Sequence, residues 1–302
     1  MNKFGKILLP LITPFDNNEE VNYSAFKQLI NYVIDKNFCD TIVVSGTTGE
    51  FNTLTFDERV KLFHAAVKAV DGRKPVIAGT GCASTKETIA LSVAAHEAGI
   101  DTCMIVAPFY CKPIQEEIYE HFSRIAVNIS ADIMLYNIPI FTGVNIEAQT
   151  LAALIRNRKF IGIKDESGMN PTQITEYYWA ANKGNKDFLI FNGDDLMLMP
   201  TIAQGAAGIV SGGSHLAGDK VRSVFEKYSE GKVDEALAIY RDIFRLFKIF
   251  GINNRIHPNP ILRKAIEMVT GIKVNKPRMP LNDINASEQE ELLRVLREAN
   301  LL

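Results

Sequence analysis

A lysine at the end of an apolar segment is the residue of this sequence best placed to perform covalent chemistry. Residues 160–165 read FIGIKD, so Lys164 follows a run that is typical of a buried strand. Burial at such a position disfavours the ammonium form, and we therefore expect the pKa of Lys164 to be lowered. A neutral amine attacks a ketone to form a Schiff base, and the iminium then lets the adjacent carbon become an enamine nucleophile. Lys164 is predicted to be the nucleophile of a class I aldolase reaction.

Such a reaction also needs groups that carry protons. Tyr136, in the run DIMLYNIP at 132–139, is expected on the strand before that of Lys164, where its phenol could protonate a carbinolamine. The alternative for Tyr136 is a ring packed in the core with a hydrogen-bonded hydroxyl. Thr48 and Tyr110 could relay the proton onward. The segment GTTGE at 46–50 offers backbone N–H groups suited to a carboxylate, although many loops are rich in glycine and threonine.

The composition excludes several classes of function. The 302 residues include 33 basic and 35 acidic residues, a balance that gives no electrostatic footprint for nucleic acid or an anionic membrane. We expect no signal peptide and no membrane span, because no apolar stretch approaches the roughly 20 residues that a span needs. The five histidines show no ligand spacing, so we expect no metal. The cysteines form no C-x-x-C pair and predict reduced thiols in the cytoplasm: Cys39, Cys82, Cys103 and Cys111.

Apolar runs alternate with segments of helical period along most of the chain. The runs lie at 7–13, 41–46, 75–81, 102–108, 132–139, 160–165, 188–193 and 206–212, and the helical segments at 24–36, 55–70, 85–97, 115–129, 148–156, 172–181, 196–204 and 220–228. Short strands that are apolar on both faces predict a parallel sheet covered by helices, and eight such units predict a closed (β/α)8 TIM barrel, an α/β fold. A doubly wound open sheet is the alternative, but the segment ITPFDNN lacks its glycine-rich turn.

The predicted domains are a catalytic barrel at 1–230 and a C-terminal helical extension at 231–302. The extension is expected to hold helices near 233–250, 259–269 and 287–299, packed on the barrel or on a neighbouring subunit. Catalytic groups of such barrels lie at the carboxyl ends of the strands. The candidates named above follow or end predicted strands, as do Thr47 and Thr48 after IVVSG.

Several motifs, in order along nearly the whole chain, resemble one family. They are GTTGE at 46–50, GTG at 79–81, PFY at 108–110, YNIP at 136–139, GIKD at 162–165, NGDD at 192–195 and GAAGIVS at 205–211. The family is that of the pyruvate-dependent class I aldolases related to dihydrodipicolinate synthase and N-acetylneuraminate lyase. The resemblance implies a homotetramer built as a dimer of dimers, which needs neither a metal nor an organic cofactor.

The resemblance also implies roles for individual residues. Lys164 resembles the Schiff-base lysine and Tyr136 the general acid and base. Thr48, together with Tyr110 from a neighbouring subunit, resembles the rest of the proton relay. The pyruvate carboxylate site is implied to consist of Thr47 and Thr48, with the backbone of Ile209 nearby.

One position departs from the synthase pattern. Synthases of this family typically carry an arginine that binds the carboxylate of aspartate semialdehyde, and the sequence YNIPIFTG places Phe141 there. Phenylalanine cannot replace the two hydrogen bonds of a guanidinium. Arg255 could supply the missing cation. The lysine-feedback site also looks absent, so L-lysine is not expected to inhibit, because bulky or apolar residues replace its polar ones: Phe51, Phe56 and Ala83.

The segments GEFNTLT, GCAST and IKDES are similar to the branch that handles 2-keto-3-deoxy sugar acids. We therefore expect cleavage of such an acid, for example 2-keto-3-deoxygluconate, to pyruvate and an aldehyde. Sugar hydroxyls could be bound by polar residues after the strands: Thr142, Asp194, Asp195, Ser211 and Ser214. Three alternatives remain: the synthase itself, a dehydratase using the same Schiff base, and a non-catalytic sensor of pyruvate or a sugar acid.

Overall fold

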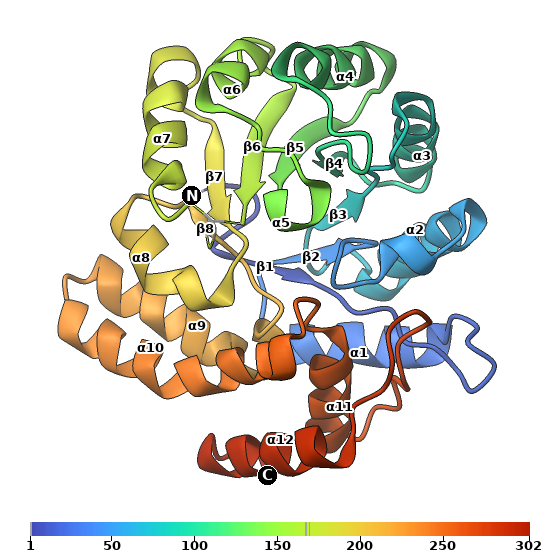
Figure 1. Ribbon diagram of the computed structural model, residues 1–302, viewed down its shortest axis with the longest axis vertical. Helices are drawn as coiled ribbons and strands as arrows, with labels where there is room; N and C mark the ends of the chain where they lie inside the picture. Colours follow the sequence, from blue (N-terminus) through green and yellow to red (C-terminus); the bar gives the residue numbers. More distant parts are fainter. Residues whose placement is uncertain (1, 167, 169) are drawn as a thin grey trace. The chain divides into compact units, whose positions relative to one another are not determined.

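A computed structural model describes residues 2–166, 168 and 170–302; Ser167, the last residue of the IKDES motif, lies outside them. Its strands are parallel and close a barrel in chain order, which confirms the predicted (β/α)8 fold class (Figure 1). The strands are β1 (Ile7–Pro10), β2 (Thr41–Val44), β3 (Val76–Gly79), β4 (Thr102–Val106), β5 (Asp132–Asn137), β6 (Phe160–Asp165), β7 (Leu189–Asn192) and β8 (Gly208–Val210).

Helices follow the strands and extend beyond the last one. The α-helices are α1 (Tyr23–Asp35), α2 (Phe56–Val70), α3 (Thr85–Glu97), α4 (Gln115–Asn128), α5 (Pro139–Thr142), α6 (Ala148–Leu154), α7 (Gln173–Gly184), α8 (Leu198–Ala203), α9 (Ser214–Ser229), α10 (Val233–Lys248), α11 (Asn259–Thr270) and α12 (Ala286–Glu298). The 3-10 helices are η1 (Phe51–Thr53), η2 (Asp195–Met197) and η3 (Ile249–Asn254). Within the described part of the chain, none of these helices is both long and apolar enough to cross a membrane.

The chain divides into two compact units. The terminal unit comprises residues 1–75 and 211–302, and the central unit comprises residues 76–210. The predicted boundary at residue 230 therefore stays a prediction, although α10, α11 and α12 form where the helical extension was expected.

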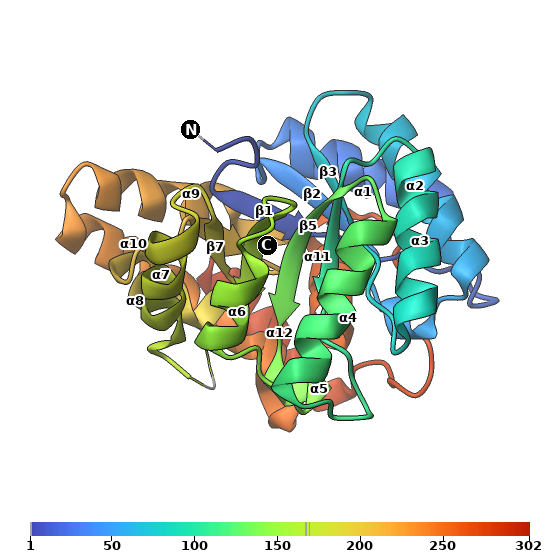
Figure 2. The same cartoon turned by 90° about the horizontal axis from the view of Figure 1, so that it is seen from above.

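The central unit carries strands β3 to β8, with helices α3, α4, α6 and α7 along their outer side (Figure 2). The strands are buried on both faces, as parallel strands covered by helices must be. Close approach of β6 to β7 requires a glycine, because a Cβ atom at Gly162 would lie 2.8 Å from the carbonyl oxygen of Leu189. The register between β5, β6 and β7 then fixes which side chains stand next to one another at the strand ends.

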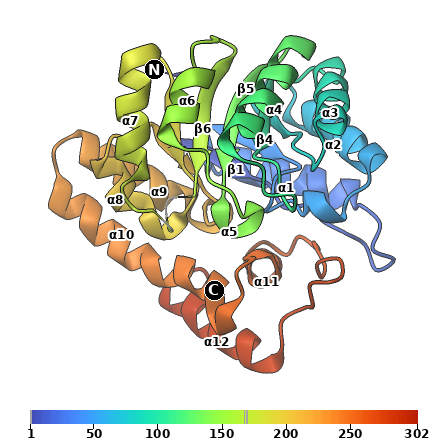
Figure 3. The ribbon, with the colours of Figure 1, turned by 45° about the horizontal axis from the view of Figure 1, so that its top comes forward.

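The terminal unit carries β1, β2 and six of the α-helices named above, and Figure 3 shows α12 beside α11 at its C-terminal end. Thr55 caps α2 with Glu58 in a reciprocal capping box, as expected from the sequence. Helix α9 begins at Ser214, six residues before the expected start, and holds a non-helical residue at Ala217. The apolar pattern of the sequence therefore predicts only the regular part of α9 that follows Ala217.

Candidate active site

Lys164 and Tyr136 stand side by side in the central unit. They are paired in register on the neighbouring strands β6 and β5. Both side chains are buried, with 5% of Lys164 and 3% of Tyr136 exposed. The Lys164 Nζ atom lies 4.0 Å from the centre of the Tyr136 ring. A primary amine and a phenol are thus held together at the carboxyl ends of two strands, where barrels of this class place their chemistry.

Three carboxylates surround this pair. Glu166 follows β6 directly, and its Oε2 atom lies 3.8 Å from Lys164 Nζ. Asp194 and Asp195 follow β7, and both act on Glu166 electrostatically. Burial would lower the pKa of Lys164, but the negative charge available on Tyr136, Glu166 and Asp195 outweighs it and raises that pKa. The expected lowering of the Lys164 pKa is therefore wrong, because desolvation was considered without its acidic neighbours.

The pKa of the Glu166 carboxyl group is strongly shifted by this environment. Burial raises its pKa to about 8, and Asp194, Asp195 and Asp165 add to the rise while Lys164 opposes it. Burial also raises the pKa of Asp194. Glu166 lay inside a motif quoted from the sequence, but no role was predicted for it.

Gly193 makes room for both members of the Lys164–Glu166 pair. A Cβ atom at this position would lie 2.5 Å from Lys164 Cε and 2.7 Å from Glu166 Oε2. Real Cβ atoms do not approach so closely, so any larger residue would displace one of the two side chains. Position 193 of the NGDD motif therefore requires a glycine for steric reasons, which could not be inferred from the sequence.

A buried amide network fixes the strand ends that carry these groups. The Asp165 carboxylate accepts hydrogen bonds from Asn137 Nδ2 at 2.9 Å and from Gln173 Nε2 at 2.7 Å. Asn137 in turn accepts one from the backbone N–H of Ile146 at 2.9 Å and donates one to Asn145 at 2.8 Å. Asp165 thus orients the adjacent backbone of Lys164 without itself facing the amine.

The GTTGE segment lies in the terminal unit. Thr48 is buried, and Thr47 is partly exposed. Backbone hydrogen bonds close the turn from Gly49 and Phe51 to the carbonyl oxygen of Gly46 at 3.0 and 3.4 Å. The His257 ring adds a bond to the Thr47 carbonyl oxygen at 3.1 Å. The threonine pair therefore sits on a tightly closed loop.

Glu50 anchors that loop from its C-terminal end. It is fully buried in a left-handed conformation with φ 55°, and its Oε1 atom accepts from Arg263 Nη2 at 2.6 Å and Nε at 2.9 Å. Asn259 Nδ2 and the backbone N–H of Arg278 complete its bonds. Neither Glu50 nor Arg263 was singled out from the sequence, because their partners are distant along the chain.

The remaining predicted residues are placed as follows. Tyr110 is 96% exposed with φ 73°, so this single chain leaves its side chain in solvent. Phe141 is 41% exposed on α5, and Ile209 is fully buried on β8 in the central unit. Arg255, considered as a replacement for the missing arginine, binds both oxygens of Glu288 at 2.7 and 2.8 Å. That bond secures the start of α12, so Arg255 is already engaged.

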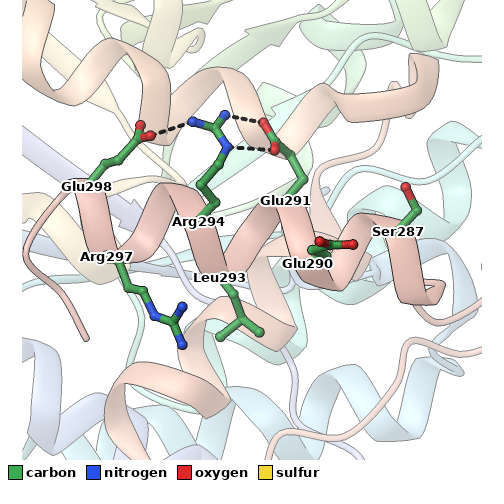
Figure 4. Close-up of a pocket in the computed structure, with 7 residues that line it drawn as sticks. All are labelled: Ser287, Glu290, Glu291, Leu293, Arg294, Arg297 and Glu298. Atoms are coloured by element: carbon green, nitrogen blue, oxygen red, sulfur yellow. Dashed lines mark hydrogen bonds and ion pairs between the residues drawn. The ribbon is translucent and has the colours of Figure 1, made fainter.

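A surface hollow of about 530 Å³ runs along α12 in the terminal unit (Figure 4). Arg294 occupies its middle, binding Glu291 at 2.5 and 2.8 Å on one side and Glu298 on the other. The hollow is lined by three glutamates and two arginines, and Arg294 is already paired. Exposed pairs of this kind contribute little to stability, and none of the predicted site residues lines the hollow.

Comparison with known proteins identifies the class to which this fold and site belong. Residues 3–299 match the Dihydrodipicolinate synthetase family. The chain is 40% identical over 288 residues to 4-hydroxy-tetrahydrodipicolinate synthase 1 of Halalkalibacterium halodurans. The matched residues cover 95% of this chain and 95% of that protein. The chain therefore belongs to the dihydrodipicolinate synthetase family. It is a class I carbon–carbon lyase, whose reaction with pyruvate runs through a lysine Schiff base.

Solved structures agree with this membership. Dihydrodipicolinate synthase of Bacillus anthracis superimposes with a TM-score of 0.92 at 36% identity, covering 98% of this chain and 99% of that one. The enzyme from Cyanidioschyzon merolae, solved with lysine bound, reaches a TM-score of 0.94 at 33% identity over the whole of both chains.

These relatives correct the expected activity. The sequence led us to expect a 2-keto-3-deoxy-sugar-acid aldolase, but curated relatives that cover nearly the whole chain are named as synthases. The expectation was wrong because it gave too much weight to Phe141 and to short segments such as IKDES. The sensor alternative is also wrong, since the chain is an enzyme of this family.

Proposed function

We propose that this protein is a 4-hydroxy-tetrahydrodipicolinate synthase, which condenses pyruvate with aspartate semialdehyde. The observation that carries the proposal is the buried Lys164 amine beside the Tyr136 phenol, 4.0 Å from the centre of its ring, in a chain whose full-length relatives are named as synthases. The synthase was the first alternative considered from the sequence.

In the proposed reaction Lys164 Nζ attacks the keto carbon of pyruvate. Tyr136 passes a proton to the oxygen of the adduct, which gives a carbinolamine. Its hydroxyl group leaves as water, and the iminium then loses a methyl proton to give an enamine. The enamine carbon attacks the aldehyde carbon of the semialdehyde, and Tyr136 protonates the new alkoxide. The Lys164–Tyr136 pairing in register supports both proton steps.

The carboxylate of pyruvate is proposed to be bound by Thr47 and Thr48, with the backbone of Ile209 nearby. Thr48, and Tyr110 from a neighbouring subunit, are proposed to complete the proton relay. The 96% exposure of Tyr110 supports a role outside its own chain. A homotetramer, a cytoplasmic location and the lack of a metal or organic cofactor stay predictions from the family resemblance.

Phe141 is proposed to affect the second substrate without changing the reaction. Position 141 carries a phenylalanine where synthases of this family carry the arginine, and Arg255 is held by Glu288. We therefore expect a high KM for the semialdehyde rather than a different product. Insensitivity to L-lysine, predicted from Phe51, Phe56 and Ala83, also stays a prediction.

A direct comparison of substrates tests the proposal. One preparation is given pyruvate with aspartate semialdehyde, and in parallel 2-keto-3-deoxygluconate, and kcat/KM is measured for both reactions. We expect the condensation to be faster by about tenfold or more. Pyruvate release from the sugar acid at the greater kcat/KM would refute the proposed substrate.

A further inference from the structure

We propose that Glu166 is a further catalytic residue, which exchanges a proton with the Lys164 amine during Schiff-base formation. The inference rests on the proposed function, in which Lys164 is the nucleophile. Its first support is distance, since Glu166 Oε2 lies 3.8 Å from Lys164 Nζ. A shift of less than one ångström would bring the two atoms into hydrogen-bond range, and catalytic bonds are often long in ligand-free structures.

The second support is the way in which the backbone holds the pair. Glu166 lies one residue beyond β6, and its backbone N–H continues the pairing with β5 by bonding to the carbonyl oxygen of Asn137 at 3.0 Å. Lys164 and Glu166 are two residues apart, so alternation places their side chains on the same side. Gly193 faces both: a Cβ atom there would meet Lys164 Cε at 2.5 Å and Glu166 Oε2 at 2.7 Å. The absence of a side chain at Gly193 thus leaves room for Glu166 beside the amine.

The third support is the charge around the pair. Lys164 Nζ faces the Tyr136 ring from β5 and Glu166 from the end of β6. Beyond them, the acidic groups that act on Glu166 are Asp165, Asp194 and Asp195. Burial first, and then these carboxylates, disfavour the negative charge on Glu166. Its pKa of about 8 lies near working pH, where a group both accepts and returns protons efficiently.

The Glu166 carboxylate takes one proton from the Lys164 ammonium, which leaves a neutral amine and a carboxylic acid. The amine adds to the keto carbon of pyruvate, and its second proton passes to the oxygen through Tyr136. The resulting carbinolamine loses its hydroxyl as water after protonation by the Glu166 carboxylic acid. The products are an iminium cation, one water molecule and a Glu166 carboxylate that lies beside the new positive charge.

The test uses pyruvate alone, so that it does not depend on the second substrate. Enzyme-catalysed exchange of the pyruvate methyl protons in D2O is followed by NMR, because it reports the imine and enamine steps. Glu166→Gln should slow the exchange on the order of 10²-fold. Glu166→Asp restores a carboxylate and should recover part of the rate. Glu176→Gln, at an exposed position on α7, is the matched control.

Two further readouts separate catalysis from structure. Glu166→Gln should still give the borohydride-reduced adduct on Lys164 at saturating pyruvate, which shows that the site is intact. The wild-type exchange rate should rise with pH through about 8, where Glu166 loses its proton, and this rise should vanish in Glu166→Gln. Exchange at the wild-type rate, or a slowed rate with the same pH dependence, would overturn the inference. Exchange by the wild type without condensation of the semialdehyde would instead refute the proposed function alone.

Discussion

Glu50 and Glu166 each lie beside a cationic side chain, and their surroundings differ. In the terminal unit, Glu50 accepts hydrogen bonds from Arg263, Asn259 and the backbone of Arg278. In the central unit, Glu166 stands 3.8 Å from Lys164, which is longer than a hydrogen bond. Glu50 is held in place by its hydrogen bonds, whereas Glu166 can still move toward the Lys164 amine.

The cations also differ in what they can exchange. Burial raises the carboxyl pKa of both Glu50 and Glu166, so both environments resist negative charge. Arg263 keeps its proton at any working pH, but Lys164 can give its proton up. The Glu50 cluster can therefore only hold the fold, while the Glu166 cluster can perform chemistry. Changes in the central cluster should affect turnover, and changes in the terminal cluster should affect stability.

The largest effect expected of these substitutions is that of Tyr136→Phe, which removes only the phenol oxygen from the central cluster. Positioned acid and base groups contribute about 10²–10⁴-fold, so kcat should fall by that order. The free energy of unfolding, measured in urea, should change little. An unchanged kcat would show that Tyr136 is a packed core aromatic, as the alternative interpretation of the sequence had it.

Arg263→Met is expected to lower the stability of the protein, with less effect on turnover than Tyr136→Phe. The substitution leaves the buried Glu50 carboxylate without its cation, and breaking such a pair costs about 3–5 kcal/mol. Urea unfolding should show this loss, and the double variant Glu50→Gln with Arg263→Met should recover part of it. A single variant as stable as the wild type would break the comparison, since the Glu50 cluster would then not be structural.

The smallest effect concerns His215, which is fully buried in the terminal unit. Burial lowers its pKa to about 4, against a bond to Gly212 that raises it, and the ordinary value is 6.5. The unfolded chain therefore binds more protons between pH 6.5 and 4. Stability is complete above pH 6.5 and falls as the pH drops, by about 1.4 kcal/mol per pH unit for one proton.

The pH dependence of urea unfolding checks this expectation. His121 and His257 carry the same shift, so the wild-type slope includes up to three protons. His215→Gln should reduce the slope by one proton. Equal slopes in the wild type and His215→Gln would contradict the account.

The barrel could be predicted from the sequence because it follows from local patterns. Runs such as FIGIKD are apolar on both faces, and Thr55 with Glu58 marks the start of α2. Short or irregular elements were missed, because they leave no periodic signal. Helix α5 has only four residues, and the expected helix at 196–204 divides into η2 and α8.

Site residues could be predicted from the sequence only where they belong to a recognisable motif at the end of a strand. Lys164 and Tyr136 were found from their strands, and the structure places them side by side. The direction of the Lys164 pKa shift could not be found, since it depends on how closely Tyr136, Glu166 and Asp195 gather around the buried amine. Glu166 could have been found, because alternation along an extended chain places it on the same side as Lys164.

Trapping with pyruvate tests the central claim, that Lys164 forms the Schiff base, most directly. The protein is incubated with pyruvate and borohydride, and the reduced adduct is mapped by mass spectrometry of peptides. Lys164→Arg serves as the control, because a guanidinium stays protonated and cannot attack the ketone. We expect one adduct, on Lys164, and neither adduct nor turnover in Lys164→Arg. An adduct on another lysine, or none in the wild type, would contradict the claim.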